Sequence, residues 1–168
     1  MKVSRSGWVG ASLAGVLGVG LYTAPVHATT STVTSTILAQ SIVPPVHVKV
    51  HGRTMAGDRW GALLRTHGLT DGYVVDNKFD PGQTTGWHSH PGPSLIFVVA
   101  GAVTNYESST AHCARKTYSA GSSFIDQGGT DVHMLINNGS VAAETIAVQL
   151  IPSGQPRRID EPEPANCH

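Results

Sequence analysis

Three histidines have a spacing that could bring their side chains together. His88 and His90 are separated by one residue, and His133 stands 43 residues after His90, beyond the Gly128-Gly129 turn. In a β-strand, residues i and i+2 point to the same face, so His88 and His90 would aim two imidazoles at one point. Three neutral imidazoles that converge inside a fold bind one divalent transition metal, and Mn, Fe, Zn, Cu and Ni all suit this ligand type.

The alternative interpretation is that His88 and His90 are hydrogen-bonded surface residues, because a His-x-His pair arises easily in a chain with nine histidines. The remaining histidines after residue 28 have no partner at ligand spacing, and we expect them to be solvated: His47, His51, His67, His112 and His168. Only the neutral ring binds a metal, so the three-His interpretation predicts that metal is lost below about pH 6.

The elements that must position these rings have the pattern of a β-protein. Gly (19) and Pro (10) are frequent, and charged residues make up only 13% of the 168 residues. Short strand-like runs recur at about ten-residue spacing, separated by turn signals such as Asp80-Pro81-Gly82. We predict strands at 46–50, 60–66, 73–79, 94–100, 102–106, 122–126, 132–137 and 143–151. This pattern indicates an all-β sandwich or barrel.

The run 94–100 is apolar at nearly every position, from Leu95 to Val99. A strand with one exposed face would alternate apolar and polar residues. We therefore expect this strand to be buried on both faces, inside the barrel and against a second layer. The second layer could be the N-terminal strands or another subunit, which leaves a homodimer open.

The charge balance and the missing motifs exclude several function classes. Lys plus Arg and Asp plus Glu each number 11, so the chain has no basic footprint for nucleic acid. The sequence has no G-x-S-x-G elbow, no P-loop and no C-x-x-C pair. A small molecule is the expected partner.

The first 28 residues have the plan of a secretory signal peptide. Lys2 and Arg5 precede an apolar run over 8–22, and small residues stand before a cleavage site after Ala28. The alternative, a membrane anchor, would need about 20 apolar residues. We therefore expect a secreted, extracytoplasmic protein with no stable membrane anchor after cleavage.

The domain plan follows from these segments. Residues 29–45 are expected to be a flexible leader because 29–36 contain mostly Thr and Ser, and 46–152 are expected to form the barrel. Residues 153–168 would be a tail. Two cysteines, Cys113 and Cys167, predict a disulfide in an oxidising compartment that pins this tail; unpaired thiols or an intermolecular bridge are the alternatives.

The spacing around the His pair resembles the first motif of the cupins, in which a Gly, two His, a Glu and a second Gly recur at set distances. Gly82, His88, His90 and Gly101 occupy the matching positions, and Ser94 stands where the Glu belongs. The resemblance implies a double-stranded β-helix, or jelly-roll barrel.

The second cupin motif is similar to the segment that follows. Gly121, Gly129, His133 and Asn137 keep its glycine and H-x3-N positions, whereas Gln127 replaces its Pro and one extra residue precedes His133. The resemblance implies that His88, His90 and His133 ligate one divalent metal.

The resemblance also implies supporting residues and an activity. Ser94, Gln83 and Asn137 would lie in a second shell. Asp126 and Asp131 flank the second motif, where turn chemistry explains both and a catalytic base is the alternative. A metal-dependent enzyme of the dioxygenase or isomerase/lyase type, acting on a small oxygenated substrate, is the first functional hypothesis. The alternative is a non-catalytic cupin of the cell envelope that binds a metal or a small ligand.

Overall fold

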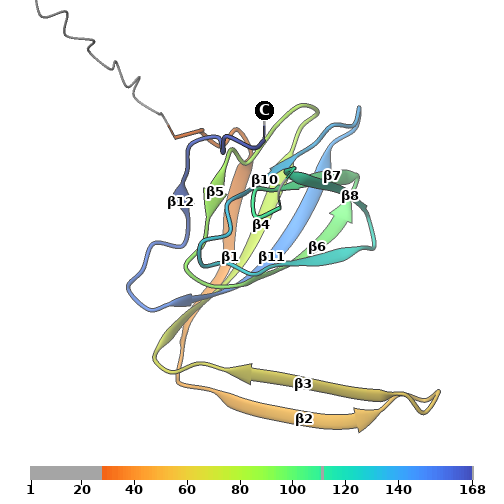
Figure 1. Cartoon of the computed structure of the whole chain (residues 1–168), viewed down its shortest axis with the longest axis vertical. Helices are drawn as coiled ribbons and strands as arrows, with labels where there is room; N and C mark the ends of the chain where they lie inside the picture. Colours follow the sequence, from red (N-terminus) through yellow and green to blue (C-terminus); the bar gives the residue numbers. More distant parts are fainter. Residues whose placement is uncertain (1–27, 111, 168) are drawn as a thin grey trace, which may run out of the picture.

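The computed structural model describes residues 28–110 and 112–167, and no helix occurs among them (Figure 1). The strands are β1 (Thr34–Val43), β2 (His47–Arg53), β3 (Arg59–Arg65), β4 (Thr70–Phe79), β5 (His88–Ser89), β6 (Ser94–Ala100), β7 (Ala102–Glu107), β8 (Ala114–Ser119), β9 (Ser123–Asp126), β10 (His133–Ile136), β11 (Ala143–Pro152) and β12 (Ile159–Asp160). The predicted all-β class is confirmed.

Two five-stranded sheets form the body, in the orders β1-β4-β11-β6-β9 and β12-β5-β10-β7-β8. Their inner faces share one apolar core, to which the first sheet contributes Val75, Phe79 and Val98 and the second contributes Val103 and Leu135. Long-range antiparallel pairs such as β11 with β4 connect strands far apart in sequence. This arrangement confirms the predicted jelly-roll barrel.

Strand β11 shows how the sequence fills the barrel. Its burial alternates residue by residue, as expected for a strand with one face on the core. The inward side chains are Ala143, Thr145, Ala147, Gln149 and Ile151, all at most 5% exposed. Two of the five, Thr145 and Gln149, are polar, so the barrel interior contains hydrogen-bonding side chains as well as apolar ones.

The expectation of a flexible leader over 29–45 is wrong for most of that segment. Residues Thr34–Val43 form β1, which pairs with β4 from Thr34 opposite Lys78 to Val43 opposite Thr70. The Thr- and Ser-rich run over 29–36 overlaps β1 only at its last three residues, and five of the ten residues of β1 are β-branched, which favours a strand. The hydrogen-bonded pairing with β4 stabilises this segment as a strand.

The barrel also has other bounds than the expected 46–152, because it begins with β1 and does not include residues 47–65. Strands β2 and β3 pair only with each other and extend away from the body as a hairpin, which Figure 1 shows below the barrel. Every residue of both strands is exposed. The barrel strands are β1 and those from β4 onward.

Strand β6 does not have the two-sided burial that its composition predicts. Ser94, Ile96 and Val98 face inward, whereas Leu95 and Phe97 on the outer face are 37% and 41% exposed. The N-terminal strands extend the sheet at its far edge instead of covering it. The second layer expected from them is therefore not found in the described part of the chain.

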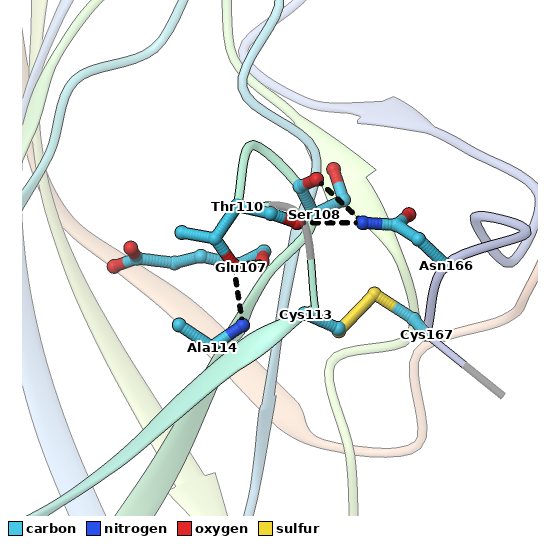
Figure 2. Close-up of a disulfide and its surroundings, with 7 residues drawn as sticks. All are labelled: Glu107, Ser108, Thr110, Cys113, Ala114, Asn166 and Cys167. Carbon is cyan, nitrogen blue, oxygen red and sulfur yellow. Dashed lines mark hydrogen bonds between the residues drawn. A yellow bond between two sulfur atoms is a disulfide. The ribbon is translucent and has the colours of Figure 1, made fainter.

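The predicted disulfide between Cys113 and Cys167 is confirmed, and it fastens the end of the chain to the segment before β8 (Figure 2). The Asn166 amide adds hydrogen bonds to the carbonyl oxygens of Ser108 at 2.9 Å and Thr110 at 2.8 Å. The predicted signal peptide lies outside the described residues except for Ala28. In residues 28–110 and 112–167, no helix has the length and apolar character that crossing a membrane requires.

Candidate metal centre

The structure brings the three predicted histidines together. His88 lies in β5 with His90 just beyond it, and His133 begins β10 as the cross-strand partner of His88. One ligand nitrogen from each ring lies within 4.8 Å of the others. All three are buried, with exposures of 4%, 5% and 2%. The surface alternative is excluded for His88 and His90.

Two of the rings are oriented by backbone carbonyl groups. His88 Nδ1 lies 2.9 Å from the Gly86 carbonyl oxygen, and His90 Nδ1 lies 2.7 Å from that of Arg157. A carbonyl oxygen only accepts hydrogen bonds, so both Nδ1 atoms carry the proton. The Nε2 atoms of His88 and His90 are then free to bind a metal, which is the usual outer-shell arrangement for metal-ligating histidine.

Burial keeps the rings neutral. It lowers the pKa of His90 and of His133 from 6.5 to about 4. The pKa of His88 lies well below its ordinary value, mainly because of burial and then because of the neighbouring His133. Neutral imidazole is the form that ligates a metal, so the three side chains are ready to bind at neutral pH.

The site contains buried polar atoms whose hydrogen bonding is incomplete. His133 Nδ1 and Asp126 Oδ2 are buried and have no hydrogen-bond partner. Leaving such atoms unpaired is unfavourable by about 1–3 kcal/mol each, which a bound cation would offset. The donor set and these unpaired atoms together fit a divalent metal.

Asp126 lies at the site, whereas the sequence interpretation assigned it mainly to turn chemistry. Its Oδ1 accepts a hydrogen bond from the Gly128 amide at 2.9 Å, as turn chemistry predicts. The same carboxylate lies 3.7 Å from His90 Nε2 and 3.7 Å from His133 Nδ1. Burial raises its pKa. The available signal was its position at the end of a strand that runs into the second motif.

Of the predicted supporting residues, Ser94 lies at the site and the other two do not. Ser94 is 1% exposed and accepts a hydrogen bond from Gln149 Nε2 at 3.0 Å. Gln83 instead accepts a hydrogen bond from the Asp80 amide at 2.8 Å and closes a turn. Asn137 donates to the carbonyl oxygens of Phe79 and Val141, which also organises a turn. The second-shell prediction for Gln83 and Asn137 is therefore corrected.

A cavity of about 330 Å³ opens beside the three rings. Its lining includes Ser94, Thr145 and Gln149 from the barrel, and Arg157 and Arg158 from the tail. The sequence interpretation assigned both arginines to an extended tail and gave them no role.

The two arginines are fixed by hydrogen bonds. Arg157 Nη1 donates to Gln149 Oε1 at 2.9 Å, and Arg158 Nη2 donates to the Thr85 carbonyl oxygen at 2.6 Å. Burial, together with the neighbouring Arg158, lowers the pKa of Arg157. Positive charge therefore borders the same cavity as the histidines, and a small anion could contact both.

The segment that carries this site is similar to a known protein family. Residues 77–149 match the family model for the cupin domain. No curated protein matches the chain.

Several solved structures are similar. They include Peruvianin-I, a cysteine peptidase from Thevetia peruviana latex (22% identity over 54% of this chain and 56% of that chain, TM-score 0.47). Oxalate oxidase in complex with glycolate is 21% identical over 53% of this chain and 45% of its own length, with a TM-score of 0.46. The chain thus spans about half of the length of these two proteins.

A Klebsiella pneumoniae protein with a double-stranded β-helix domain is 21% identical over 71% of this chain and 86% of its own, with a TM-score of 0.47. The family match covers both histidine-bearing segments and most of the barrel strands. The segment that matches the cupin-domain model, residues 77–149, includes His88, His90 and His133.

Proposed function

We propose that the protein is an extracytoplasmic cupin that binds one divalent metal ion through His88, His90 and His133 and presents it to a small, oxygen-rich anion. The observation that carries the proposal is the convergence of three buried, neutral imidazoles within 4.8 Å at a cavity bordered by two arginines. The Cys113–Cys167 disulfide and the N-terminal sequence support export.

The side chains around the cavity have separable roles. Gly86 and Arg157 hold two rings through their carbonyl oxygens, so the metal-binding nitrogens point away from the backbone. Gln149 connects Ser94 to the Arg157 guanidinium and fixes that cation beside the rings. A bound metal would act as a Lewis acid toward a carboxylate or enolate oxygen. The arginines would hold the remaining negative charge of the ligand.

The first candidate activity is that of a metal-dependent enzyme, of the oxygenase or lyase type, on a small oxygenated substrate. A non-catalytic binding protein is the second candidate. One observation favours the second: the cavity lining in the described part of the chain contains no Asp or Glu. A general base from that lining would have to be a histidine that the metal leaves free.

Metal analysis of natively purified protein tests the proposal first. We expect one divalent ion per chain, lost in the His88→Ala/His90→Ala double variant. Metal-loaded protein is then screened against 1,3-diketones, flavonols, thiols and sugar phosphates. Turnover supports the enzyme, whereas binding without turnover supports the binding protein. A wild-type protein that takes up no ion from Mn, Fe, Zn, Cu or Ni solutions contradicts the whole proposal.

A further inference from the structure

The acid absent from the first motif has a counterpart on the neighbouring strand. Ser94 in β6 is the cross-strand partner of Asp126 in β9. Side chains of directly opposed residues lie on the same face of a sheet, with Cβ atoms about 4.5–5.5 Å apart. Both residues are buried, with exposures of 1% and 4%. Asp126 therefore directs a carboxylate into the barrel next to the position where the motif would place its Glu.

The distance between Asp126 and His90 is that of two ligands that share a cation. Oδ2 lies 3.7 Å from His90 Nε2, the ring nitrogen that is not hydrogen-bonded to the backbone. This separation is too long for a hydrogen bond. Two atoms that each bind one ion at about 2.1 Å, with an angle near 120°, lie about 3.6 Å apart. Oδ2 has no hydrogen-bond partner, whereas Oδ1 accepts from the Gly128 amide.

We propose that Asp126 is the fourth protein ligand of the metal and binds it through Oδ2. The inference rests on the proposed metal site and adds a carboxylate to its three imidazoles. The carboxylate lowers the net charge of a divalent site from +2 to +1. It also adds a hard oxygen donor, which suits Mn²⁺ or Fe²⁺ better than an all-imidazole set does.

The test compares Asp126→Asn with a matched control, Asp80→Asn, which makes the same chemical change at an exposed turn residue. Mn²⁺ is titrated into each protein, and folding is checked by circular dichroism. We expect Asp126→Asn to weaken Mn²⁺ binding about 10- to 100-fold and Asp80→Asn to leave it unchanged. Equal Mn²⁺ affinity in wild type and Asp126→Asn overturns this inference alone, whereas a wild type that binds none overturns the metal site itself.

A second measurement needs no variant. Infrared difference spectra of the wild type with and without Mn²⁺ should show the carboxylate stretch of one acidic side chain shifting on metal addition. If the difference spectrum contains no carboxylate band, Mn²⁺ does not bind a carboxylate, and the assignment of Asp126 as a ligand is overturned.

The β2–β3 hairpin carries a separate inference, because its two faces differ in chemistry. Opposed residues share a face, and the register pairs Val48 with Leu64, Val50 with Ala62 and Gly52 with Trp60. This apolar face is open, with Trp60 54% and Leu64 44% exposed. The opposite face contains Leu63 and most of the charged residues: His47, Lys49, His51, Arg53, Arg59 and Arg65.

The body has an exposed apolar face of its own. It lies on the outside of β6, β9 and β11 and comprises Leu95, Phe97, Val99, Ile125 and Val148, which are 37% to 63% exposed. A two-stranded hairpin alone is at best marginally stable in water. An apolar patch of this extent on a sheet indicates an interaction surface.

We infer that the occupant is a second copy of the chain, whose hairpin lays its apolar face on this outer sheet. Opposite net charges favour docking of the hairpin of one copy on the body of the other. Residues 47–65 contain Lys49, Arg53, Arg59 and Arg65 against the single acid Asp58, whereas the remaining described residues contain five basic and ten acidic residues. Reciprocal exchange of the two hairpins gives a closed two-fold dimer.

Neighbouring leucines provide the test. Leu64 lies on the apolar face and Leu63 on the basic face, and both are exposed. Sedimentation should give a dimer for wild type and Leu63→Asp, and a monomer for Leu64→Asp and for Phe97→Asp on the sheet. A monomeric wild type, or equal behaviour of the two leucine variants, overturns the inference.

Discussion

His133 is the direct cross-strand partner of His88, and their ring centroids lie 4.2 Å apart. The third ring of the centre is thus positioned by backbone pairing between β10 and the two-residue strand β5. On its other side, β5 pairs with β12, where Asp160 opposes His88. The C-terminal segment therefore supports the metal centre through β12, the short strand that follows β11.

Replacing both His88 and His90 by Ala should abolish stoichiometric metal binding and leave the barrel folded. The apolar core lies on strands that do not need the ion, so circular dichroism should match that of wild type. Metal content by elemental analysis is the measurement, with His51→Ala on the exposed hairpin as control. Loss of metal from the His51 variant would point to a different site.

The metal-free protein should lose stability as the pH falls from 7 toward 5. The folded-state pKa values of His90 and His133 are about 4, against an ordinary value of 6.5. Between these values the unfolded chain binds more protons, so each ring contributes up to about 1.4 kcal/mol of lost stability per pH unit.

Asp126 acts in the opposite direction, because burial raises its pKa and so gives stability at low pH that is lost as the pH rises. Urea unfolding of chelator-treated protein at several pH values between 5 and 7 measures the net effect. A stability that does not change over this range would show that the rings are not buried in the neutral form.

Arg157→Gln should weaken anion binding with little effect on the metal. The variant retains the backbone carbonyl that orients His90 but removes the cation beside the cavity. A hydrogen bond to a charged group contributes about 1.5–3 kcal/mol, so affinity for oxalate, used as a dianionic probe, should fall about tenfold or more. Calorimetry on metal-loaded protein measures it, and Lys78→Gln, whose side chain is 63% exposed, is the control. Equal oxalate affinity in both variants would remove Arg157 from the ligand site.

Replacing Cys113 and Cys167 by Ser should lower stability and oxalate affinity together. The bridge spans 54 residues, and the chain-entropy estimate for such a loop is at most about 4 kcal/mol. Because the bridge fastens the segment that carries Arg157 and Arg158, the loosened tail should hold the anion less well. Urea unfolding and oxalate titration of the double variant measure the two effects, and an unchanged oxalate affinity would show that the tail stays in place without its bridge.

The sequence predicted the fold and the three histidines because their signals are local. The i, i+2 spacing of His88 and His90 and the turn before His133 directed the rings inward, and strand-length apolar runs marked β4, β6 and β11. Turn residues such as Asn137 were harder to place, since the same spacing fits a hydrogen bond to the pocket or to the turn.

Features that depend on strand pairing could not be read from the sequence. Asp126 reaches the rings because β9 pairs with β6, and residues Thr34–Val43 form β1 because β4 offers them an open edge. The outer face of β6 looked buried because composition does not show which neighbour covers it. Arg157 and Arg158 reach the cavity only through the course of the tail.

Two separate segments supply the functional groups of the cavity: the barrel and the tail that the disulfide anchors. The barrel holds the imidazoles, whereas the guanidinium groups arrive on a segment that follows β11 and is tied down by Cys167. Side-chain substitutions at Arg157 and Arg158 could therefore redirect ligand preference while the backbone contacts of this segment with the metal centre are kept. Engineering new specificity into this protein would start at its last residues.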